Sequence, residues 1–519
     1  MRSLAFLSAL SVGFLAVSQG YNGRYDAFEN GFAQESYGVE INSTGAVAFS
    51  GSADYDSISS GSTFFHLSVV LTQLDQLGNK LWEKRTWRPF HSSATGWANS
   101  SDTIPGGGYV VGGASEDSLG NDEVYLMRFD TQGDTLWTRV FGGPNLIEYW
   151  IGRQVKYTTD GGFMIVGDRG GANGNGVDAF LIKTDNMGFE LWRRSYGGPF
   201  IDGFVSLDKC AANSYFTGGV KFLSMTNSDL WVQRVDQNGN VVWSVSWGGE
   251  YKESNAQLSS LSDGNAFVAG GWSYAPDFAL MKPYLAKIDS ADGGIIWDRT
   301  YGPEAYSTTF FVGKEAPNGD LIAAGVSYAN SDINNVQQGL LLRTTSEGDS
   351  LWMFNYFYQD DLITEGQGRF YDVLPTPDGG FVAAGAAYNP VGMGYPAGYS
   401  QDTWVVKVDG QGCIVPGCNS VGVVEQATNL LGALTLFPNP VTSGQPITVQ
   451  LELPPSVKNE ALQLTVVDAI GKVVHTQQIS AGAHALSFGE GRGVALSGVY
   501  YVHIAAGGKW LTGGKFVVE

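Results

Sequence analysis

The chain has 519 residues, and its 51 Asp and Glu against 30 Lys and Arg give a formal net charge of −21. This length exceeds a single small domain, and a composition of 43% hydrophobic residues excludes a disordered chain. The acidic balance argues against nucleic acid or an anionic membrane as a partner, because phosphate binding needs clustered Lys and Arg. The 71 glycines follow no three-residue period, so they indicate many turns rather than a collagen-like chain.

Residues 1–20 have the pattern of an export signal. Arg2 is followed by an apolar run from Leu4 to Val17, and small residues stand at Ala16 and Ser18. A transmembrane anchor is the alternative, but this run is shorter than the ~20 residues that a spanning helix needs. We therefore expect a mature, exported chain that begins near residue 21.

A repeated unit occupies most of the chain. One copy, residues 122–143, runs from Asp122 through Asp130 and Gly133 to Trp137 and a Gly-Gly pair. Similar copies follow at intervals of 51 to 55 residues, and a seventh, residues 402–412, has Pro416 where the tryptophan would fall. The tryptophans that close the other copies are Trp82, Trp137, Trp192, Trp243, Trp297 and Trp352.

Two turn motifs divide each copy into strands. Asp-Gly or Asn-Gly, as at Asp160-Gly161 and Asn318-Gly319, stands before a short apolar run and predicts a tight hairpin whose two central residues both have positive φ. Asp-x-x-Gly predicts a second turn, in which the Asp side chain caps the backbone. Each copy therefore predicts four short antiparallel strands.

Units of about 55 residues with two apolar faces cannot bury both faces alone. Stacking them around a ring covers both, so the chain is predicted to be all-β, with a seven-bladed β-propeller over residues 21–418. The six tryptophans are expected to pack between neighbouring blades. A linear solenoid is the alternative, which the absence of polar capping units at the ends disfavours.

The start of the mature chain predicts how the ring closes. The seventh copy lacks its outermost strand, and a leftover segment before the first complete copy, beginning Arg24-Tyr25, resembles Arg194-Ser195-Tyr196. We expect residues near Tyr21 to Asp26 to supply the missing strand.

Two of the three cysteines lie close together. Cys413 and Cys418 flank a Gly/Pro turn at the end of the repeats, where an oxidising compartment would favour a disulfide that fixes the turn. Cys210 has no evident mate and is expected to be a buried apolar residue.

The last ninety residues differ from the repeats. Residues 419–431 are expected to be a linker, and residues 432–519 show period-2 alternation with turns every ~8–12 residues. This pattern predicts a small Ig-like antiparallel β-sandwich.

Short motifs mark the last segment, and their residues are Phe437, Pro438, Asn439, Pro440, Asp468, Gly471, Lys472, Gly498, Tyr500 and Lys515. With these residues, the segment 432–519 resembles the type A C-terminal sorting domain of Bacteroidetes type IX secretion substrates. The preceding repeats, with their Asp-Gly-Gly-Phe motif, also resemble propellers of secreted proteins of that phylum. The resemblance implies export across both membranes, with the type IX machinery as a partner and a final place outside the cell or on its surface. An ordinary Ig-like adhesion module is the alternative.

The repeats carry no recognisable catalytic motif, and we assign no catalytic residue, cofactor or metal ion. The repeated Asp residues are expected to cap turns, with calcium binding as the alternative. Aromatic segments that interrupt the repeats are better candidates for ligand binding, although packing between loops would also explain them. They are residues 87–90, Trp97, residues 148–150, residues 272–274, residues 354–361 and residues 389–399.

Two functions remain open. The favoured one is a non-catalytic, monomeric, exported propeller that binds a glycan or a protein at the cell surface. The alternative is a secreted carbohydrate-active hydrolase or lyase that uses carboxylates in the central funnel.

Overall fold

The computed structural model describes the chain in segments, with β-strands as nearly all of its regular structure. A three-residue 3-10 helix, η1 (Pro276–Phe278), is the one helical element among the described residues. The all-β prediction is therefore confirmed. The described residues are 20–25, 34–57, 63–86, 88, 91–117, 119–142, 149–170, 176–211, 213–254, 256–305, 307–330, 335–358, 367–388, 401–414, 424–425, 433–453, 462–469, 471–480, 482–487, 497–506 and 509–519.

The described strands before residue 414 form seven antiparallel sheets, which we number along the chain. Sheet 1 contains β2 (Gln34–Ile41), β3 (Ala46–Ser57), β4 (Thr63–Leu74) and β5 (Lys80–Thr86). Sheet 2 contains β6 (His91–Thr95), β7 (Ser101–Thr103), β8 (Tyr109–Asp117), β9 (Asp122–Phe129) and β10 (Thr135–Phe141). Sheet 3 contains β11 (Tyr149–Tyr157), β12 (Phe163–Gly170), β13 (Val177–Thr184) and β14 (Glu190–Tyr196).

The remaining four sheets repeat this order. Sheet 4 contains β15 (Asp202–Cys210), β16 (Ser214–Phe222), β17 (Ser228–Val235) and β18 (Val241–Trp247). Sheet 5 contains β19 (Gln257–Ser260), β20 (Ala266–Ser273), β21 (Met281–Ile288) and β22 (Ile295–Thr300). Sheet 6 contains β23 (Thr309–Glu315), β24 (Leu321–Asn330), β25 (Asn335–Thr344) and β26 (Ser350–Tyr356). Sheet 7 contains β27 (Gln367–Pro375), β28 (Phe381–Tyr388), β29 (Gln401–Val408) and β1 (Tyr21–Tyr25).

The Asp-Gly segments are turns, but of a different kind from the one predicted. At the turn after β11, Gly161 has a φ of +89°, whereas Asp160 is outside the positive-φ region. Gly161 N bonds to Thr158 O at 3.0 Å, and Thr158 N bonds to Gly162 O at 2.9 Å. The loop therefore needs one left-handed residue and not two, which lets Asp occupy the preceding position without strain.

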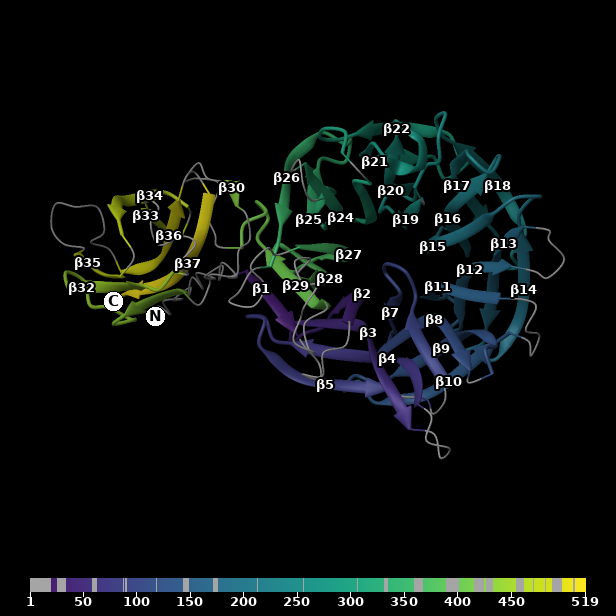
Figure 1. Cartoon of the computed structure of the whole chain (residues 1–519), viewed down its shortest axis with the longest axis horizontal. Helices are drawn as coiled ribbons and strands as arrows, with labels where there is room; N and C mark the ends of the chain where they lie inside the picture. The colour runs from purple at the N-terminus through teal and green to yellow at the C-terminus, as the bar shows by residue number, and fades with distance from the viewer. Residues whose placement is uncertain are drawn as a thin grey trace, which may run out of the picture.

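Apolar side chains fill the space between each sheet and the next. The third strands are buried on both faces, as Ala179, Phe180, Leu181 and Ile182 of β13 illustrate. One apolar cluster lies between sheets 7 and 1 and includes Tyr21, Val39, Ala46 and Val405. Sheet 7 therefore has a neighbour on each side, as the other described sheets do, and Figure 1 shows strands β2 to β29 following one another around a circle.

β1 pairs with β29 in antiparallel register, from Tyr21 opposite Lys407 to Tyr25 opposite Thr403. The prediction that the first residues of the mature chain supply the outermost strand of the last sheet is confirmed. Trp404 Nε1 donates to Asn22 Oδ1 at 2.6 Å, and Arg24 pairs with Asp402. The two ends of the repeat region are thus joined by backbone, amide and ionic contacts.

The first strands of neighbouring sheets are connected by aspartate side chains, of which Asp372 is buried and Asp102 and Asp208 are half-buried. Asp102 Oδ2 accepts a hydrogen bond from Tyr157 N at 2.8 Å, and Asp208 Oδ2 accepts one from Ser260 N at 2.8 Å. Asp372 Oδ2 accepts one from Val39 N at 2.9 Å, which connects sheet 7 to sheet 1. Each carboxylate satisfies a backbone donor of the next sheet that faces the preceding sheet instead of a paired strand.

The C-terminal residues form two further sheets. One contains β30 (Val424–Glu425), β37 (Lys509–Val518), β36 (Gly498–Ala506), β33 (Leu462–Asp468) and β34 (Val473–Ile479). The other contains β31 (Leu434–Phe437), β32 (Pro446–Leu451) and β35 (Gly482–Ser487). Both contribute to one apolar cluster. β30 pairs parallel with β37, so two residues of the predicted linker belong to this part of the fold.

Candidate functional site

The first strand of each of five sheets contains a β-bulge, which adds one residue opposite the second strand. The register shifts occur between Ser36 and Gly38, Gly152 and Gln154, Phe204 and Ser206, Phe310 and Val312, and Phe370 and Asp372. A bulge redirects the side chain of its extra residue. The extra residues are Tyr37, Arg153, Val205, Phe311 and Tyr371.

Sheet 2 enlarges this feature into a five-residue excursion between β6 and β7. Its ends are fixed by hydrogen bonds from Gly96 N to Gly112 O at 2.9 Å and from Gly112 N to Ser100 O at 3.2 Å. Ala98 and Asn99 adopt positive φ values of 48° and 49°, which is costly for non-glycine residues. The half-buried indole of Trp97 is at the centre of the excursion.

Four of these residues form one aromatic cluster, which we call the inner-strand cluster: Tyr37, Trp97, Phe311 and Tyr371. The Trp97 ring lies 5.9 Å from Tyr37, 5.2 Å from Tyr371 and 5.8 Å from Phe311. Tyr371 also stacks on Phe311, with centroids 5.3 Å apart. The bulges therefore bring together rings from sheets 1, 2, 6 and 7.

Two cavities flank Trp97. One has a volume of about 370 Å³ and is lined by Tyr37, Thr95, Arg153 and Glu35 among others. The other has a volume of about 530 Å³ and is lined by Phe222, Glu253, Phe311, Tyr328 and Arg369 among others. Both volumes fall in the roughly 300–1,000 Å³ range of small-molecule sites.

Charged groups around the cavities are held in place by protein partners. Arg369 Nη2 lies 3.1 Å from Glu35 Oε1, and its guanidinium is 5.4 Å from the Tyr371 ring centroid. Tyr37 also donates to Glu35. Arg153 Nη2 contacts Asp168 Oδ2 at 2.7 Å. The rims thus offer fixed hydrogen-bonding groups beside apolar faces.

Glu253 is a buried carboxyl group in the larger cavity. It accepts hydrogen bonds from Gly249 N at 2.8 Å and Ser273 N at 2.7 Å. Burial outweighs these two bonds and raises the pKa of Glu253 to about 7.

Trp97 was among the aromatic residues predicted to be available for binding, and it lines both cavities. Two other predicted segments contribute packing instead: Trp272 lies 5.3 Å from Tyr284, and Phe354 stacks on Trp352 at 5.4 Å. Of the predicted segments, residues 87, 89–90, 148, 359–361 and 389–399 lie outside the described residues, as do the side chains of residues 149 and 150.

The six repeated tryptophans share one environment. Each ring lies over a left-handed glycine in the turn before the last strand of the next sheet, where a β-carbon on that glycine would come within 2.7 to 3.1 Å of the ring. Four of these turns are Asp-x-x-Gly, whereas Gly348 stands three residues after Thr345 and Gly293 four residues after Asp289. Trp352 Nε1 also donates to Gly410 O at 3.0 Å. The tryptophan–glycine pairs are Trp82–Gly133, Trp137–Gly188, Trp192–Gly239, Trp243–Gly293, Trp297–Gly348 and Trp352–Gly412.

Tyr21 takes the tryptophan's place where sheet 7 meets sheet 1. A β-carbon on Gly78 would lie 2.5 Å from the Tyr21 ring. Four residues later, Tyr25 donates its hydroxyl to Gly78 O at 2.6 Å, as Tyr196 does to Gly239 O at 2.7 Å. β1 therefore reproduces the side-chain contacts of the other outermost strands.

The repeated Asp residues bond to their own turns. In one example, Asp236 Oδ1 accepts hydrogen bonds from Asn238 N and Asn240 N, each at 2.8 Å. Cys413 is disulfide-bonded, its expected partner Cys418 lies outside the described residues, and Cys210 is a free thiol.

Most of the predicted sorting-motif residues lie at strand ends and turns, whereas Tyr500 and Lys515 lie inside β36 and β37. Asn439 Nδ2 donates to Lys515 O at 2.9 Å, and Asn439 Oδ1 accepts from Val517 N at 3.0 Å, so one amide joins the Phe437–Pro440 segment to β37. Asp468 Oδ1 accepts from Lys472 N at 2.9 Å across a turn in which Gly471 has a φ of +81°. Gly498 begins β36, where Tyr500 stacks on Phe516 at 5.5 Å.

Sequence reasoning missed Tyr37, Arg153, Phe311 and Tyr371. A usable signal exists, because each stands seven residues before the first residue of its turn, which is Thr44, Asp160, Asn318 or Asp378. When the copies are aligned on that turn, these four residues fall at one position, which is aromatic or arginine in all four copies.

One family comparison identifies the C-terminal region. Residues 435–519 match the family described as the secretion system C-terminal sorting domain. This match supports the chain as a type IX secretion substrate, which reaches the cell surface or is secreted. No curated protein matches the sequence.

Solved structures show only distant similarity. A puromycin hydrolase variant has 12% identity and a TM-score of 0.37, with 69% of this chain and 59% of that one covered. PorZ, a surface component of the type IX secretion system of Porphyromonas gingivalis, has 8% identity and a TM-score of 0.18, with 94% and 99% covered. The chain spans less than two thirds of the hydrolase, and neither likeness carries a functional argument.

Among the described residues, no helix has the length and apolar character required to cross a membrane.

Proposed function

We propose that the chain is an exported glycan-binding protein, built as a seven-bladed β-propeller over residues 21–418 and followed by a linker (419–431) and a sorting domain (432–519). The contacts of sheet 7 with sheet 1 and the circular order of the strands in Figure 1 support the propeller. In this arrangement the six tryptophans lock neighbouring blades, and the disulfide of Cys413 fixes the end of the last blade. The domain folds as an Ig-like sandwich that the type IX machinery reads.

The position of Trp97 between two cavities carries the binding proposal. The aromatic faces of the inner-strand cluster provide flat apolar surfaces with negative π-clouds, on which the C–H face of a sugar ring can stack. Arg369, Glu35 and Arg153 offer fixed donors and acceptors for hydroxyl groups at the rims. A ligand of this mixed character matches a sugar better than a purely apolar molecule.

A glycan array followed by calorimetry tests this proposal. Trp97→Ala is expected to weaken binding of the selected glycan by about 10- to 100-fold, since stacking and burial of one aromatic side chain are lost. Phe189→Ala removes an exposed ring in the turn between β13 and β14, which lines neither cavity, and should leave the affinity unchanged. Equal affinity of wild type and Trp97→Ala would contradict the proposed site.

The alternative of a carbohydrate-active hydrolase or lyase is favoured by one observation. The carboxyl of Glu253 lines the larger cavity, and a group with a pKa near 7 can act as a general acid at neutral pH. Product analysis of the bound glycan after incubation distinguishes the two functions. Turnover that Glu253→Gln abolishes would support the enzyme, whereas unchanged glycan would support binding alone.

A further inference from the structure

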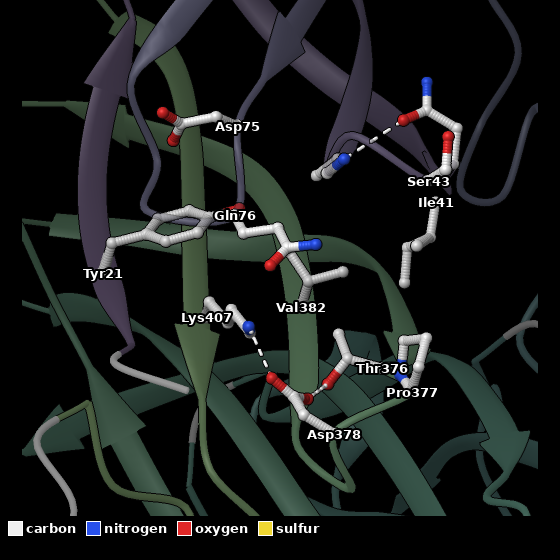
Figure 2. A pocket seen from close by; sticks show the side chains of 13 residues that line it. Tyr21, Ile41, Ser43, Asp75, Gln76, Thr376, Pro377, Asp378, Val382 and Lys407 are labelled. Atoms are coloured by element: carbon white, nitrogen blue, oxygen red, sulfur yellow. Dashed lines mark hydrogen bonds and ion pairs between the residues drawn. The ribbon is translucent and has the colours of Figure 1, made fainter. Parts of the chain in front are cut away.

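A small cavity lies where sheet 7 meets sheet 1, away from the proposed glycan site. It has a volume of about 180 Å³, and its walls come from β1, the β2–β3 and β4–β5 turns, the β27–β28 turn, β28 and β29. Figure 2 shows Tyr21, Val382 and Ile41 around this space, with Lys407 directed toward Asp378. Lys407 Nζ and Asp378 Oδ2 are 2.7 Å apart.

Two residues that line the cavity are smaller than their counterparts in most of the other sheets. Tyr21 stands where the other outermost strands have tryptophan. Ala46 follows the first turn of sheet 1, at a position where sheet 5 has Ala266, sheet 6 has Leu321 and the four other sheets have an aromatic residue. Those aromatic residues are Tyr109, Phe163, Tyr215 and Phe381.

At two other sheet junctions this position holds a phenol ring that faces the preceding sheet. The Tyr109 hydroxyl accepts a hydrogen bond from Asn42 Nδ2 at 2.9 Å. The Tyr215 ring faces Thr158 and Thr159, in the turn between β11 and β12, and these two residues oppose the rise that burial causes in the pKa of Tyr215.

The turn of sheet 7 reproduces part of the turn beside Tyr215, with Pro377 in the place of Thr159. In sheet 3, Thr158 donates to Asp160, which also contacts Lys183 Nζ at 2.9 Å. In sheet 7, Thr376 donates to Asp378, which contacts Lys407. The junction of sheets 7 and 1 thus retains the threonine, aspartate and lysine of that turn, while residue 46 is alanine.

We propose that the cavity between sheets 7 and 1 is a binding site for a phenol ring, which inserts beside Ala46 with its hydroxyl toward Thr376 and Asp378. The size agrees, since an engineered apolar cavity of roughly 150 Å³ binds benzene. Tyr21, Ile41 and Val382 supply the apolar walls. The phenol belongs either to a tyrosine side chain of a partner peptide or to a free small molecule.

Binding of 4-methylphenol to the full chain, followed by NMR, tests the site. We expect saturable binding, with intermolecular NOEs from the ring protons to the methyl groups of Ile41 and Val382. Toluene, which lacks the hydroxyl, should bind about tenfold more weakly, since one hydrogen bond is lost. Absent NOEs to both residues, or equal affinity for toluene, would overturn the proposal.

Two substitutions of Ala46 provide matched variants. Ala46→Tyr fills the cavity from within, so it should abolish 4-methylphenol binding and raise the melting temperature. Ala46→Gly keeps the cavity open and should retain binding. Undiminished binding by a folded Ala46→Tyr chain would contradict the site. If that variant does not fold, the NOE measurement on the unmodified chain still tests whether the phenol ring binds beside Ile41 and Val382.

A competition experiment with a tyrosine peptide distinguishes the two sources of the phenol ring. Glycyl-tyrosyl-glycine amide that competes with 4-methylphenol would identify a tyrosine side chain as a ligand that the cavity accepts. Binding of 4-methylphenol without competition by the peptide would restrict the site to free phenols. None of these results depends on the glycan site, because Trp97 does not line this cavity.

Discussion

The glycines of the Asp-x-x-Gly turns carry two constraints at once. Gly239 has a φ of +79°, where a side chain is strained, and a β-carbon there would lie 2.8 Å from the Trp192 ring. Gly319, in the Asn-Gly turn between β23 and β24, has a φ of +85°, but nothing lies within 4 Å of its β-carbon position. Substitutions at Gly239 and Gly319 therefore separate two destabilising effects of a side chain: backbone strain, which occurs at both positions, and the clash with a tryptophan ring, which occurs only at Gly239.

We expect Gly319→Ala to lower the free energy of unfolding by about 1–2 kcal/mol, through backbone strain alone. Gly239→Ala should lower it by about 1–3 kcal/mol more, because the Trp192 ring must also move. Urea unfolding of both variants measures the difference. Equal losses would contradict the view that tryptophan packing on glycine stabilises the sheet junction.

Glu40 gives the fold a calculable pH dependence. Burial raises the pKa of Glu40 to about 8, from 4.5 for an ordinary Glu side chain. Asp102 and Asp372 act in the same direction, whereas Lys156 and a hydrogen bond from Ser101 oppose it. Lys314 and Asp208 also belong to this buried charge cluster, since both interact with Lys156 or with each other.

The sign follows from proton linkage. Between pH 4.5 and about 8 the folded chain holds a proton on Glu40 that the unfolded chain has lost, so this group makes stability fall as pH rises. Glu40→Gln removes this term and should gain about 1–4 kcal/mol relative to wild type between pH 5 and pH 8. Urea unfolding at several pH values measures it, with exposed Glu347→Gln as the control. If the stability gained by Glu40→Gln does not increase as the pH rises from 5 to 8, the raised pKa is not a property of Glu40.

Among the elements, β1 contributes more than its five residues suggest. It forms the outermost strand of sheet 7, and its Tyr21 and Tyr25 both contact Gly78. Its Asn22 accepts a hydrogen bond from the Trp404 indole. Because sheet 7 contacts sheet 1 across these residues, loss of β1 exposes the edge of β29 and the apolar cluster between the two sheets.

Deletion of residues 21–32 is therefore expected to lower the free energy of unfolding by several kcal/mol, since strand pairing and burial are lost together. The melting temperature should fall sharply as a result. Differential scanning calorimetry measures the change. A synthetic peptide of residues 20–33 added to the deleted chain should recover part of the lost stability. An unchanged melting temperature after deletion would show that β1 does not close the ring.

For the whole molecule, the sorting region should act without the seven sheets, since it has its own apolar cluster. Residues 432–519 fused to a periplasmic reporter are expected to carry it to the surface or the medium in a host with type IX secretion. Fractionation and immunoblotting measure the result, and a fusion that ends at residue 508 lacks β37 and should fail. A full-length fusion that remains in the periplasm would contradict the sorting role.

Much of the architecture was predictable because the repeat is local. Asp-Gly and Asp-x-x-Gly turns, apolar runs and regular tryptophans each reflect interactions within about 55 residues, so the all-β class and four strands per copy could be read directly. The closure by residues 21–25 was also predictable, since Arg24-Tyr25 repeats the order of Arg194-Ser195-Tyr196. The sorting region was recognisable from short motifs at its strand ends and turns.

The candidate sites depend on contacts between distant copies. Trp97 could be singled out as an interruption of the repeat, but its neighbours Phe311 and Tyr371 lie more than two hundred residues away and meet it only through bulges on three different sheets. The phenol cavity likewise requires Tyr21 and Ala46 to face the turn of Thr376. The sequence by itself determined the repeating strands and the cellular address, because local turn chemistry and short motifs encode them. Only the tertiary structure decided where variable side chains converge, because that convergence arises from the packing of sheets far apart in the chain.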